Sequence, residues 1–329
     1  MPQKILIDAD PGIVDALAVL AALADPALDV LALTPCPGSV SGLQAMRNLQ
    51  YLTGLLDPLR HPRIGLSDDR TAPADLLPAG LPRLQVLNGR FGLGETEPLV
   101  PDLVHRRESA RLIVDVVREF PGEVRILTLG PLTNVAMALD IDPELPVLLN
   151  GLICLCGSLG AAGDATASAE FNTWSHPQAA RRVIASPVGK ILVPLEIFHG
   201  PGLTFDDIDR LTGLIPSNPV GEFAAGLLQF AARASRQHLP FEEVSLPAAA
   251  VLAIAAGAAA FETQQLAVDV ETTGELSAGT LIIDRRRYSQ RAVTAEMVTS
   301  LDQAAVVDYF CRGIRRAPAR PQRPVSYTH

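Results

Sequence analysis

Several residue types are scarce in this sequence. Lysine occurs only at Lys4 and Lys190, and the 329 residues include four cysteines and one tryptophan. Four cysteines in a chain of this length exclude a disulfide-rich scaffold, and they fit a reducing cytoplasm. The 27 basic side chains are outnumbered by 36 acidic ones, which gives a net charge of −9. This acid excess argues against a nucleic-acid partner, because binding to phosphates normally needs a basic surface.

Long apolar runs are also missing. The longest, from Leu246 to Phe261, is shorter than the roughly 18 residues expected of a membrane-spanning helix. The chain begins with Met1 to Lys4 and soon carries Asp8 and Asp10, which makes this start too acidic for the core of a signal peptide. We therefore expect a cytoplasmic protein with no membrane partner.

The sequence lacks the common nucleotide-binding and hydrolase motifs. It has no G-x-G-x-x-G after a predicted strand, no P-loop, no H-E-x-x-H and no G-x-S-x-G. The glycines between Gly157 and Gly163 have the wrong spacing for a dinucleotide-binding loop, which disfavours a Rossmann-type oxidoreductase. Cys154 and Cys156 lie in an apolar run, and buried thiols are a better interpretation than metal ligands because no second Cys/His pair is near.

What the sequence does have is an alternation of two kinds of apolar segment. Short continuous runs typical of buried strands span 4–8, 28–33, 124–129, 147–156 and 190–195, and helix-type periodicity spans 16–23, 108–120 and 130–137. This alternation predicts an α/β fold in which a mostly parallel open sheet carries helices on both faces. We expect a single domain over residues 1–314, followed by a Pro/Arg-rich C-terminal tail over 315–329.

Three acidic residues follow the first predicted strand, and ligands of open parallel sheets bind at the carboxyl ends of strands. Asp8 and Asp10 share one face of the strand because they are two residues apart, and Asp15 falls in the first turn of the next helix. Taken singly, Asp15 could be an acid favoured by the helix dipole, and Asp10 could be a turn residue. Three converging carboxylates favour a functional site, because their repulsion needs compensation by a hard cation such as calcium or magnesium.

The segment 8–15, D-A-D-P-G-I-V-D, resembles the signature D-x-D-P-G-x-D-D of the inosine–uridine nucleoside hydrolase family. Four further blocks resemble family motifs in the same order along the chain. They are Leu129-Gly130-Pro131-Leu132-Thr133-Asn134, Ala169-Glu170-Phe171-Asn172 with Pro177, Val193-Pro194-Leu195 with His199, and Val270-Glu271-Thr272 with Gly274. The resemblance therefore implies the nucleoside hydrolase fold, with its Rossmann-like core, over nearly the whole predicted domain.

The resemblance also implies an activity and assigns roles to residues. Family members cleave the N-glycosidic bond of nucleosides, with calcium held by aspartates and an aspartate that takes a proton from the attacking water. By match, Asp10 is the implied catalytic base and a calcium ligand, Asp15 and the Leu129 carbonyl are further metal ligands, and Asp8 is a supporting carboxylate of the metal site. The implied substrate-binding residues are Glu170, Asn172 and Asp164, the last in place of an asparagine. A homodimer or homotetramer with a small nucleoside-like ligand is implied in the same way.

The sequence departs from the family pattern at several functional places. Val14 and Ser39 stand where the family has a ribose-binding aspartate and asparagine, and Asn88 stands where a loop of the family has a histidine. Leu246 replaces an aspartate that binds calcium. Loss of even an outer partner of a metal typically costs about 10–100-fold in affinity or activity, so we expect weak calcium binding and poor turnover on ordinary nucleosides.

Two functions therefore stay open. The retained Asp8, Asp10 and Asp15 favour a nucleoside hydrolase with impaired or altered activity. The lost residues favour a family member without catalysis that binds a small ligand or a protein partner. The sequence also leaves open whether Glu242 or Glu243 takes the place of the missing acid.

Overall fold

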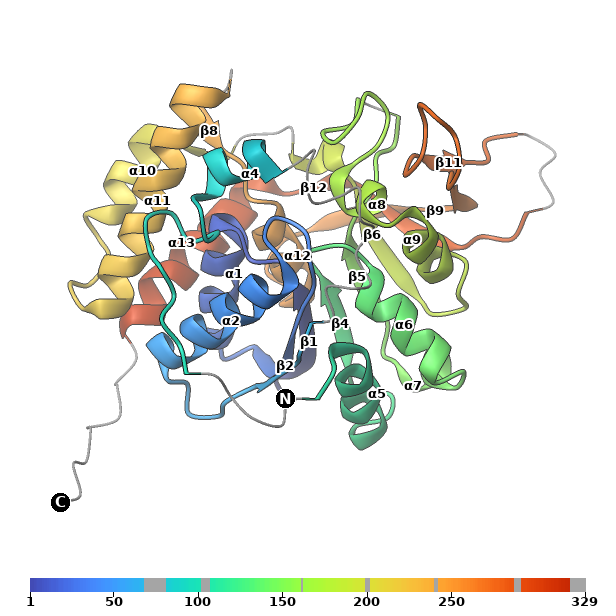
Figure 1. The fold of residues 1–329 in the computed structure, drawn as a ribbon, viewed down its shortest axis with the longest axis horizontal. Coiled ribbons are helices and arrows are strands. Elements are labelled where there is room, and N and C mark those ends of the chain that lie inside the picture. Colours follow the sequence, from blue (N-terminus) through green and yellow to red (C-terminus); the bar gives the residue numbers. More distant parts are fainter. Residues whose placement is uncertain are drawn as a thin grey trace.

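The computed structural model describes residues 1–67, 81–101, 107–160, 162–198, 202–239, 242–286 and 291–319. Its centre is an eight-stranded sheet in the order β3-β2-β1-β4-β5-β6-β12-β9 (Figure 1). These strands are β1 (Gln3–Ala9), β2 (Leu28–Pro35), β3 (Arg63–Ile64), β4 (Arg125–Thr128), β5 (Leu152–Leu155), β6 (Lys190–Val193), β9 (Phe261–Leu266) and β12 (Ala295–Leu301). Neighbouring strands are parallel except for β12 and β9. The predicted α/β fold with a mostly parallel sheet is confirmed.

The strand order reverses at β1. The chain first moves outward from β1 to β2 and β3, and β4 then pairs with the other side of β1. Such a reversal leaves a crevice at the carboxyl ends of the two central strands, because the connections that follow them leave in opposite directions. Asp8 is the last residue of β1 in register with β4, where it is paired with Thr128. The candidate acids therefore lie at the carboxyl end of the reversal point.

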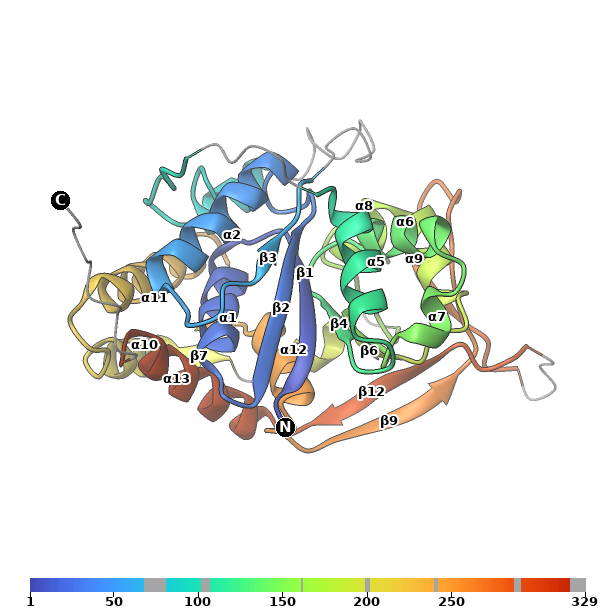
Figure 2. The same cartoon turned by 90° about the horizontal axis from the view of Figure 1, so that it is seen from below.

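Helices cover both faces of the sheet (Figure 2). One layer holds α1 (Ile13–Ala24), α2 (Gly42–Leu56), α10 (Phe205–Thr212), α11 (Pro219–His238), α12 (Pro247–Ala255) and α13 (Gln303–Ala319), with α4 (Leu81–Asn88) beside α11. The other layer holds α5 (Ser109–Glu119), α6 (Thr133–Ile141), α7 (Leu145–Leu148) and α9 (Pro177–Ile184). Ile5 and Ile7 of β1 pack into the core under the first layer, and Leu6 packs under the second. A strand buried on both faces is apolar at successive positions, which explains the unbroken run I-L-I.

The shorter elements lie around the rim. They are α8 (Phe171–Ser175), the 3₁₀ helix η2 (Leu195–Phe198), the antiparallel pair β7 (Leu203–Thr204) and β8 (Glu243–Val244), and the antiparallel pair β10 (Val268–Val270) and β11 (Leu281–Ile283).

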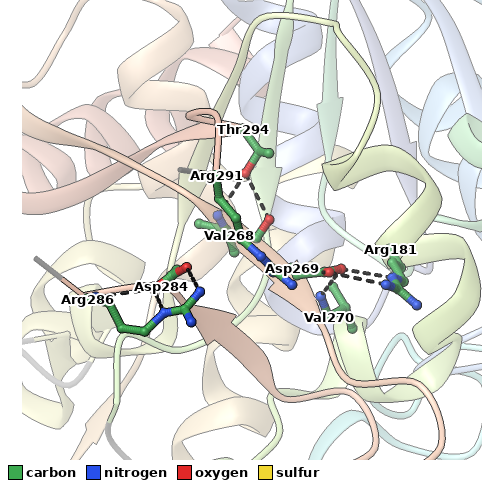
Figure 3. A network of polar contacts seen from close by, with 8 residues as sticks. All are labelled: Arg181, Val268, Asp269, Val270, Asp284, Arg286, Arg291 and Thr294. Atoms are coloured by element: carbon green, nitrogen blue, oxygen red, sulfur yellow. Dashed lines mark hydrogen bonds and ion pairs between the residues drawn. The ribbon is translucent and has the colours of Figure 1, made fainter. Parts of the chain in front are cut away.

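Charged side chains fix the β10–β11 pair to α9 (Figure 3). Arg181 of α9 donates two hydrogen bonds to the carboxylate of Asp269, from Nε to Oδ1 at 2.8 Å and from Nη2 to Oδ2 at 3.2 Å. β11 in turn supports the loop that joins β5 to α8, because a Cβ added at Gly157 would overlap the side chain of Leu281. Gly157 also has a φ of 79°, which favours glycine. The pair of strands therefore helps to hold the loop that leads to Glu170.

Most of the predicted segments coincide with elements of the structure, but the strand predicted over 147–156 is wrong in its first half. Leu145–Leu148 forms α7, and β5 begins only at Leu152. Pro146 lies in the first turn of α7, where its fixed φ is favourable, and Gly151 with a φ of 115° separates the helix from the strand. The pattern of apolar runs does not predict β9 and β12, which complete the sheet.

No described helix is both long enough and apolar enough to cross a membrane. The four cysteines, all within the described part of the chain, form no disulfide, and Cys154 and Cys156 are both fully buried. Helix α13 continues through Ala319, so it includes residues 315–319 of the predicted tail. The rest of that tail and His199 lie outside the described residues.

Candidate active site

Asp8 is the most deeply buried of the three acids. Its Oδ1 accepts hydrogen bonds from Thr34 Oγ1 at 2.6 Å and from Asn134 Nδ2 at 2.8 Å. Its Oδ2 is also buried and has no hydrogen-bond partner among the described residues. Burial raises the pKa of Asp8 to about 7, although both hydrogen bonds act to lower it. A buried carboxylate oxygen without a donor is costly, so a proton or a cation near this atom would be stabilising.

Asp10 lies just after β1 and is enclosed by two glycines. Its side chain is buried, and its Oδ2 accepts a hydrogen bond from the backbone N–H of Ser39. A Cβ added at Gly38 would overlap Oδ2, and a Cβ added at Gly130 would overlap Oδ1. These glycines follow β2 and β4, the strands on either side of β1, so the sheet itself brings them to the carboxylate. Burial raises the pKa of Asp10 to about 6.

Asp15 lies in the first turn of α1 and is half-buried. Burial and the nearby charge of Asp10, in that order, raise the pKa of Asp15 well above its ordinary value. The charge of Asp10 also raises the pKa of Asp8. The structure therefore brings together all three acids that the sequence singles out. The charge of Asp10 acts on both of the others, since it raises the pKa of Asp8 and the pKa of Asp15.

Leu129 and Asn172 connect this acid cluster to β5. The Leu129 N–H donates to the carbonyl of Asp8 at 2.8 Å, and the Leu129 carbonyl accepts from Asn172 Nδ2 at 2.9 Å. The same amide donates to the Leu155 carbonyl at 2.9 Å, so Asn172 joins the carboxyl ends of β4 and β5. A carbonyl oxygen has two lone pairs, so Leu129 can accept this bond and still offer a lone pair to a cation.

Glu170 and Asp164 gather at the N-terminus of α8. Glu170 Oε1 accepts from the Asn172 N–H at 2.8 Å, and Oε2 accepts from the N–H groups of Gly157 at 2.8 Å and Thr173 at 3.1 Å. Asp164 Oδ1 accepts from the Phe171 N–H at 2.8 Å. Burial and the charge of Asp164 raise the pKa of Glu170 to about 8. Both acids thus organise the backbone of this turn, and their contact with ribose stays a prediction.

The chemistry of the donors at β1 and β4 fits a hard cation. Asp10 and Asp15 supply carboxylates that repel each other, Leu129 supplies a carbonyl, and Asp8 adds an oxygen without a donor. Within the described ranges, however, no three His, Cys, Asp or Glu side chains are arranged so that they could hold one metal ion. Asp10, Asp15 and the Leu129 carbonyl are therefore the groups that could hold calcium. They supply fewer protein oxygens than calcium usually binds.

Leu246, where the family pattern has an aspartate, is the N-cap residue of α12 and is buried in the apolar core. Helix α12 packs against α1, β4 and β5, which carry or precede the other candidate ligands. Leucine offers no acceptor to the first N–H groups of the helix. Glu243, considered as a replacement acid, lies on β8 and accepts a hydrogen bond from the Gly202 N–H at 2.9 Å. Val14 is half-buried and packs against the same apolar core.

Thr34 and Asn48 are not among the residues that the sequence singles out, and Asn88 is singled out only as a departure from the family pattern. Thr34 donates to Asp8 from the end of β2, and the rule that ligands gather at strand ends could have found it. Asn48 of α2 is fully buried and donates to the carbonyls of Pro11 at 3.1 Å and Phe91 at 2.8 Å. Asn88 Oδ1 accepts from the Ile13 N–H at 2.9 Å. Nothing in the local sequence indicates these last two contacts, which join distant segments.

Comparison with known proteins identifies relatives of this chain in sequence and in fold. Residues 5–308 match the family model of the inosine-uridine preferring nucleoside hydrolase. The chain is 29% identical over 321 residues to the pyrimidine-specific ribonucleoside hydrolase RihA of Salmonella newport, a match that covers 96% of this chain and 99% of that protein. It is 34% identical over 211 residues to uridine nucleosidase 1 of Arabidopsis thaliana, with 64% of this chain and 61% of that protein covered.

The structure is similar to that of the purine-preferring ribonucleoside hydrolase from Gardnerella vaginalis. The TM-score is 0.87 at 24% identity, and the match covers 97% of this chain and 100% of the other. This likeness confirms the predicted nucleoside hydrolase fold. With the family match over residues 5–308, it leads to one conclusion: the chain belongs to the inosine-uridine preferring nucleoside hydrolase family.

Proposed function

We propose that this chain hydrolyses the N-glycosidic bond of a ribonucleoside, with activity that is impaired or altered relative to its relatives. The observation that carries the proposal is the convergence of Asp8, Asp10 and Asp15 at the carboxyl ends of β1 and β4. Names of relatives point to pyrimidine ribonucleosides, and to uridine in particular, as the substrates to test first.

In this proposal Asp10 is the general base. Its pKa of about 6 leaves the carboxylate ionised near neutral pH and basic enough to accept a proton from an attacking water. The two enclosing glycines and the Ser39 N–H hold the carboxylate in place. Calcium bound by Asp10, Asp15 and the Leu129 carbonyl would compensate their charge and polarise the water.

The proposed impairment has a physical reason at two residues. Leucine at position 246 cannot act as a ligand, so calcium would bind with fewer charged oxygens and lower affinity. The apolar Val14, where the family pattern has an aspartate, would leave a ribose hydroxyl without its hydrogen bond, at a cost of about 1–3 kcal/mol if the hydroxyl is buried.

The test is release of free base from uridine, cytidine and inosine in excess calcium, with Asp10→Asn as the matched variant. We expect slow release by the wild-type chain and a loss of at least about 100-fold in Asp10→Asn, in the range found when general acid–base groups are removed. Release that stays at background in the wild type, or that is equal in the two proteins, would overturn the proposal.

A second candidate function is a family member that binds a ligand without catalysis. Two observations favour it. Among the described residues, no three potential ligand side chains form a metal site, and Leu246 is apolar and buried. This function predicts that calcium leaves the melting temperature unchanged. A calcium-dependent rise of several degrees in wild type, absent in Asp15→Asn, would contradict it.

A dimer or tetramer and a cytoplasmic location remain expectations from the family resemblance and the sequence. Light scattering of the purified full-length chain measures the first, and fractionation of cells that express it measures the second.

A further inference from the structure

The turn between β1 and α1 is held from outside by two asparagines. Asn88, the last residue of α4, accepts a hydrogen bond from the Ile13 N–H at 2.9 Å and donates to the Leu84 carbonyl at 3.2 Å. Asn48 of α2 donates to the carbonyls of Pro11 and Phe91. The turn that connects Asp10 to Asp15 is therefore hydrogen-bonded to two elements distant in sequence, donating to Asn88 and accepting from Asn48.

Helix α1 needs such help because its own cap residue has no side chain. The first N–H groups of any helix lack partners within the helix. The N-cap of α1 is Gly12, which makes no side-chain hydrogen bond, so Asn88 supplies the missing acceptor from α4. The fit is close, because a Cβ added at Gly12 would lie 2.6 Å from Asn88 Oδ1.

The loop that follows Asn88 lies against the same turn. A Cβ added at Gly92 would lie 2.8 Å from the Pro11 carbonyl oxygen, and the φ of 81° at Gly92 also favours glycine. The Gly94 N–H donates to the Asn88 carbonyl at 2.8 Å, which closes the loop on itself. The loop is thus anchored at both ends, and α4, drawn in teal beside α11, provides its base (Figure 1).

We propose that Asn88 is a positioning residue, which caps α1 from outside and thereby fixes Asp15 at its distance from Asp10. Asp15 is two residues beyond Ile13, in the turn that Asn88 caps. The two carboxylates repel each other, so a frayed first turn would let Asp15 move outward and weaken binding of a divalent cation between them. The consequence for cation binding rests on the proposed function, whereas the cap itself does not.

The test compares Asn88→Ala with Asn218→Ala in the full-length chain. Asn218 also caps a helix, because its Oδ1 accepts from the Gly221 N–H at the start of α11 at 3.0 Å. In Asn88→Ala we expect backbone amides of residues 13–16 to exchange with solvent about tenfold faster by mass spectrometry, and exchange in α12 to stay unchanged. In Asn218→Ala we expect faster exchange only near residue 221.

A second measurement addresses cation binding. The rise in melting temperature on adding calcium chloride should shrink in Asn88→Ala, with a loss in affinity of about 10–100-fold, and should be kept in Asn218→Ala. Asn88→Asp retains an acceptor and should restore slow exchange of residues 13–16. If Asn88→Ala does not fold, Asn88→Asp is compared with Asn88→Leu, and only the aspartate should protect these amides.

Unchanged exchange of residues 13–16 in Asn88→Ala, or equal acceleration there in Asn218→Ala, overturns the inference. Failure of the proposed function has a different signature. In that case the wild type releases no base and does not respond to calcium, yet the exchange difference between the two alanine variants persists.

Discussion

Two glycines make room for the Asp10 carboxylate, because a side chain at either position would overlap it. Gly38 and Gly130 flank the two carboxylate oxygens at the ends of β2 and β4. At Gly130 an added Cβ would also lie 2.7 Å from the buried Sγ of Cys36. At single-residue scale, the position of the Asp10 carboxylate, the proposed base, is therefore set by the absence of side chains around it.

Gly130→Ala should displace Asp10 and abolish most activity. We expect hydrolysis to fall about 100-fold, because a small displacement of a catalytic group is costly, and the free energy of unfolding to fall by about 1–3 kcal/mol from overpacking. The control is Gly54→Ala in α2, where an added Cβ meets nothing within 4 Å. Base release measures the activity of both variants, and urea unfolding measures their free energy of unfolding. Equal activity in the two variants would contradict the assigned role of Gly130.

Glu170 gives stability a dependence on pH. Burial holds its pKa at about 8 in the folded chain, above its ordinary value of 4.5. Between these values the folded chain keeps a proton that the unfolded chain has lost, so this group's contribution to stability falls as pH rises from about 4.5 to 8. In Glu170→Gln we expect that decline to be smaller, as measured by urea unfolding at pH 5 and pH 8. The control is Glu222→Gln, at an exposed acid, which should leave the decline unchanged. If stability falls as steeply with pH in Glu170→Gln as in wild type, the decline does not come from Glu170.

The acids could be predicted from the sequence because they lie in one short segment. Asp8, Asp10 and Asp15 span a strand end and one helical turn, so local geometry alone brings them together. Their partners could not be predicted in the same way. Asn88 is 75 positions from Ile13, and Asn134 is 126 positions from Asp8. Only the packing of whole elements brings such pairs within hydrogen-bond distance.

Among the elements, α12 has an unfavourable beginning. Its N-cap is Leu246, which makes no side-chain cap, although the helix packs against α1, β4 and β5. An N-cap aspartate would accept hydrogen bonds from the first turn and could also face a cation. Leucine at position 246, where the family pattern has an aspartate, thus leaves the start of α12 without a side-chain cap.

Leu246→Asp should increase the response to calcium. We expect about tenfold or higher affinity than wild type and a larger rise in melting temperature with calcium, because one carboxylate ligand is regained. Without calcium the buried charge should destabilise the chain. Leu246→Asn provides the cap without the charge and is the matched control. A calcium response no greater than that of Leu246→Asn would count against a metal site beside α12.

The central strands and the helices α1, α5 and α6 could be predicted because they are apolar on both faces or periodic. The closing strands could not. β9 reads F-E-T-Q-Q-L and lies at the edge of the sheet, half-buried at most, and its neighbour β12 reads A-E-M-V-T-S-L, with exposed polar residues inside the strand. An edge strand needs no continuous apolar run, because one side faces solvent and polar residues there prevent further pairing. The error over 147–156 has a different origin. There a single apolar run contains both a short helix and a strand, and the run alone does not show where one ends and the other begins.

Across the whole molecule, the first and last helices of the described chain pack together. Helix α13 packs along α1, and Tyr309 Oη donates to Asp25 Oδ2 at 2.8 Å across 284 positions of sequence. Asp25 follows the last residue of α1, at the opposite end from Asp15. A helix of this length places the two ends about 18 Å apart. The contact therefore serves stability and lies far from the acids.

Tyr309→Phe should lower stability without lowering activity. We expect a loss of about 1–3 kcal/mol in the free energy of unfolding, because the buried Asp25 loses a donor. The rate of base release per folded molecule should equal that of wild type. Urea unfolding and the nucleoside assay together check this. A parallel fall in activity would mean that the two ends of α1 are coupled.

The 126 positions between Asp8 and Asn134 also bear on how the chain is made. A ribosome releases β1 well before β4 and α6, and a contact across so much sequence closes slowly. Until α6 arrives, the Asp8 carboxylate keeps its water, and β1 cannot be buried on both sides. A nascent chain that stops short of residue 134 should therefore leave β1 open to protease and to chaperones, as limited proteolysis of arrested chains would show.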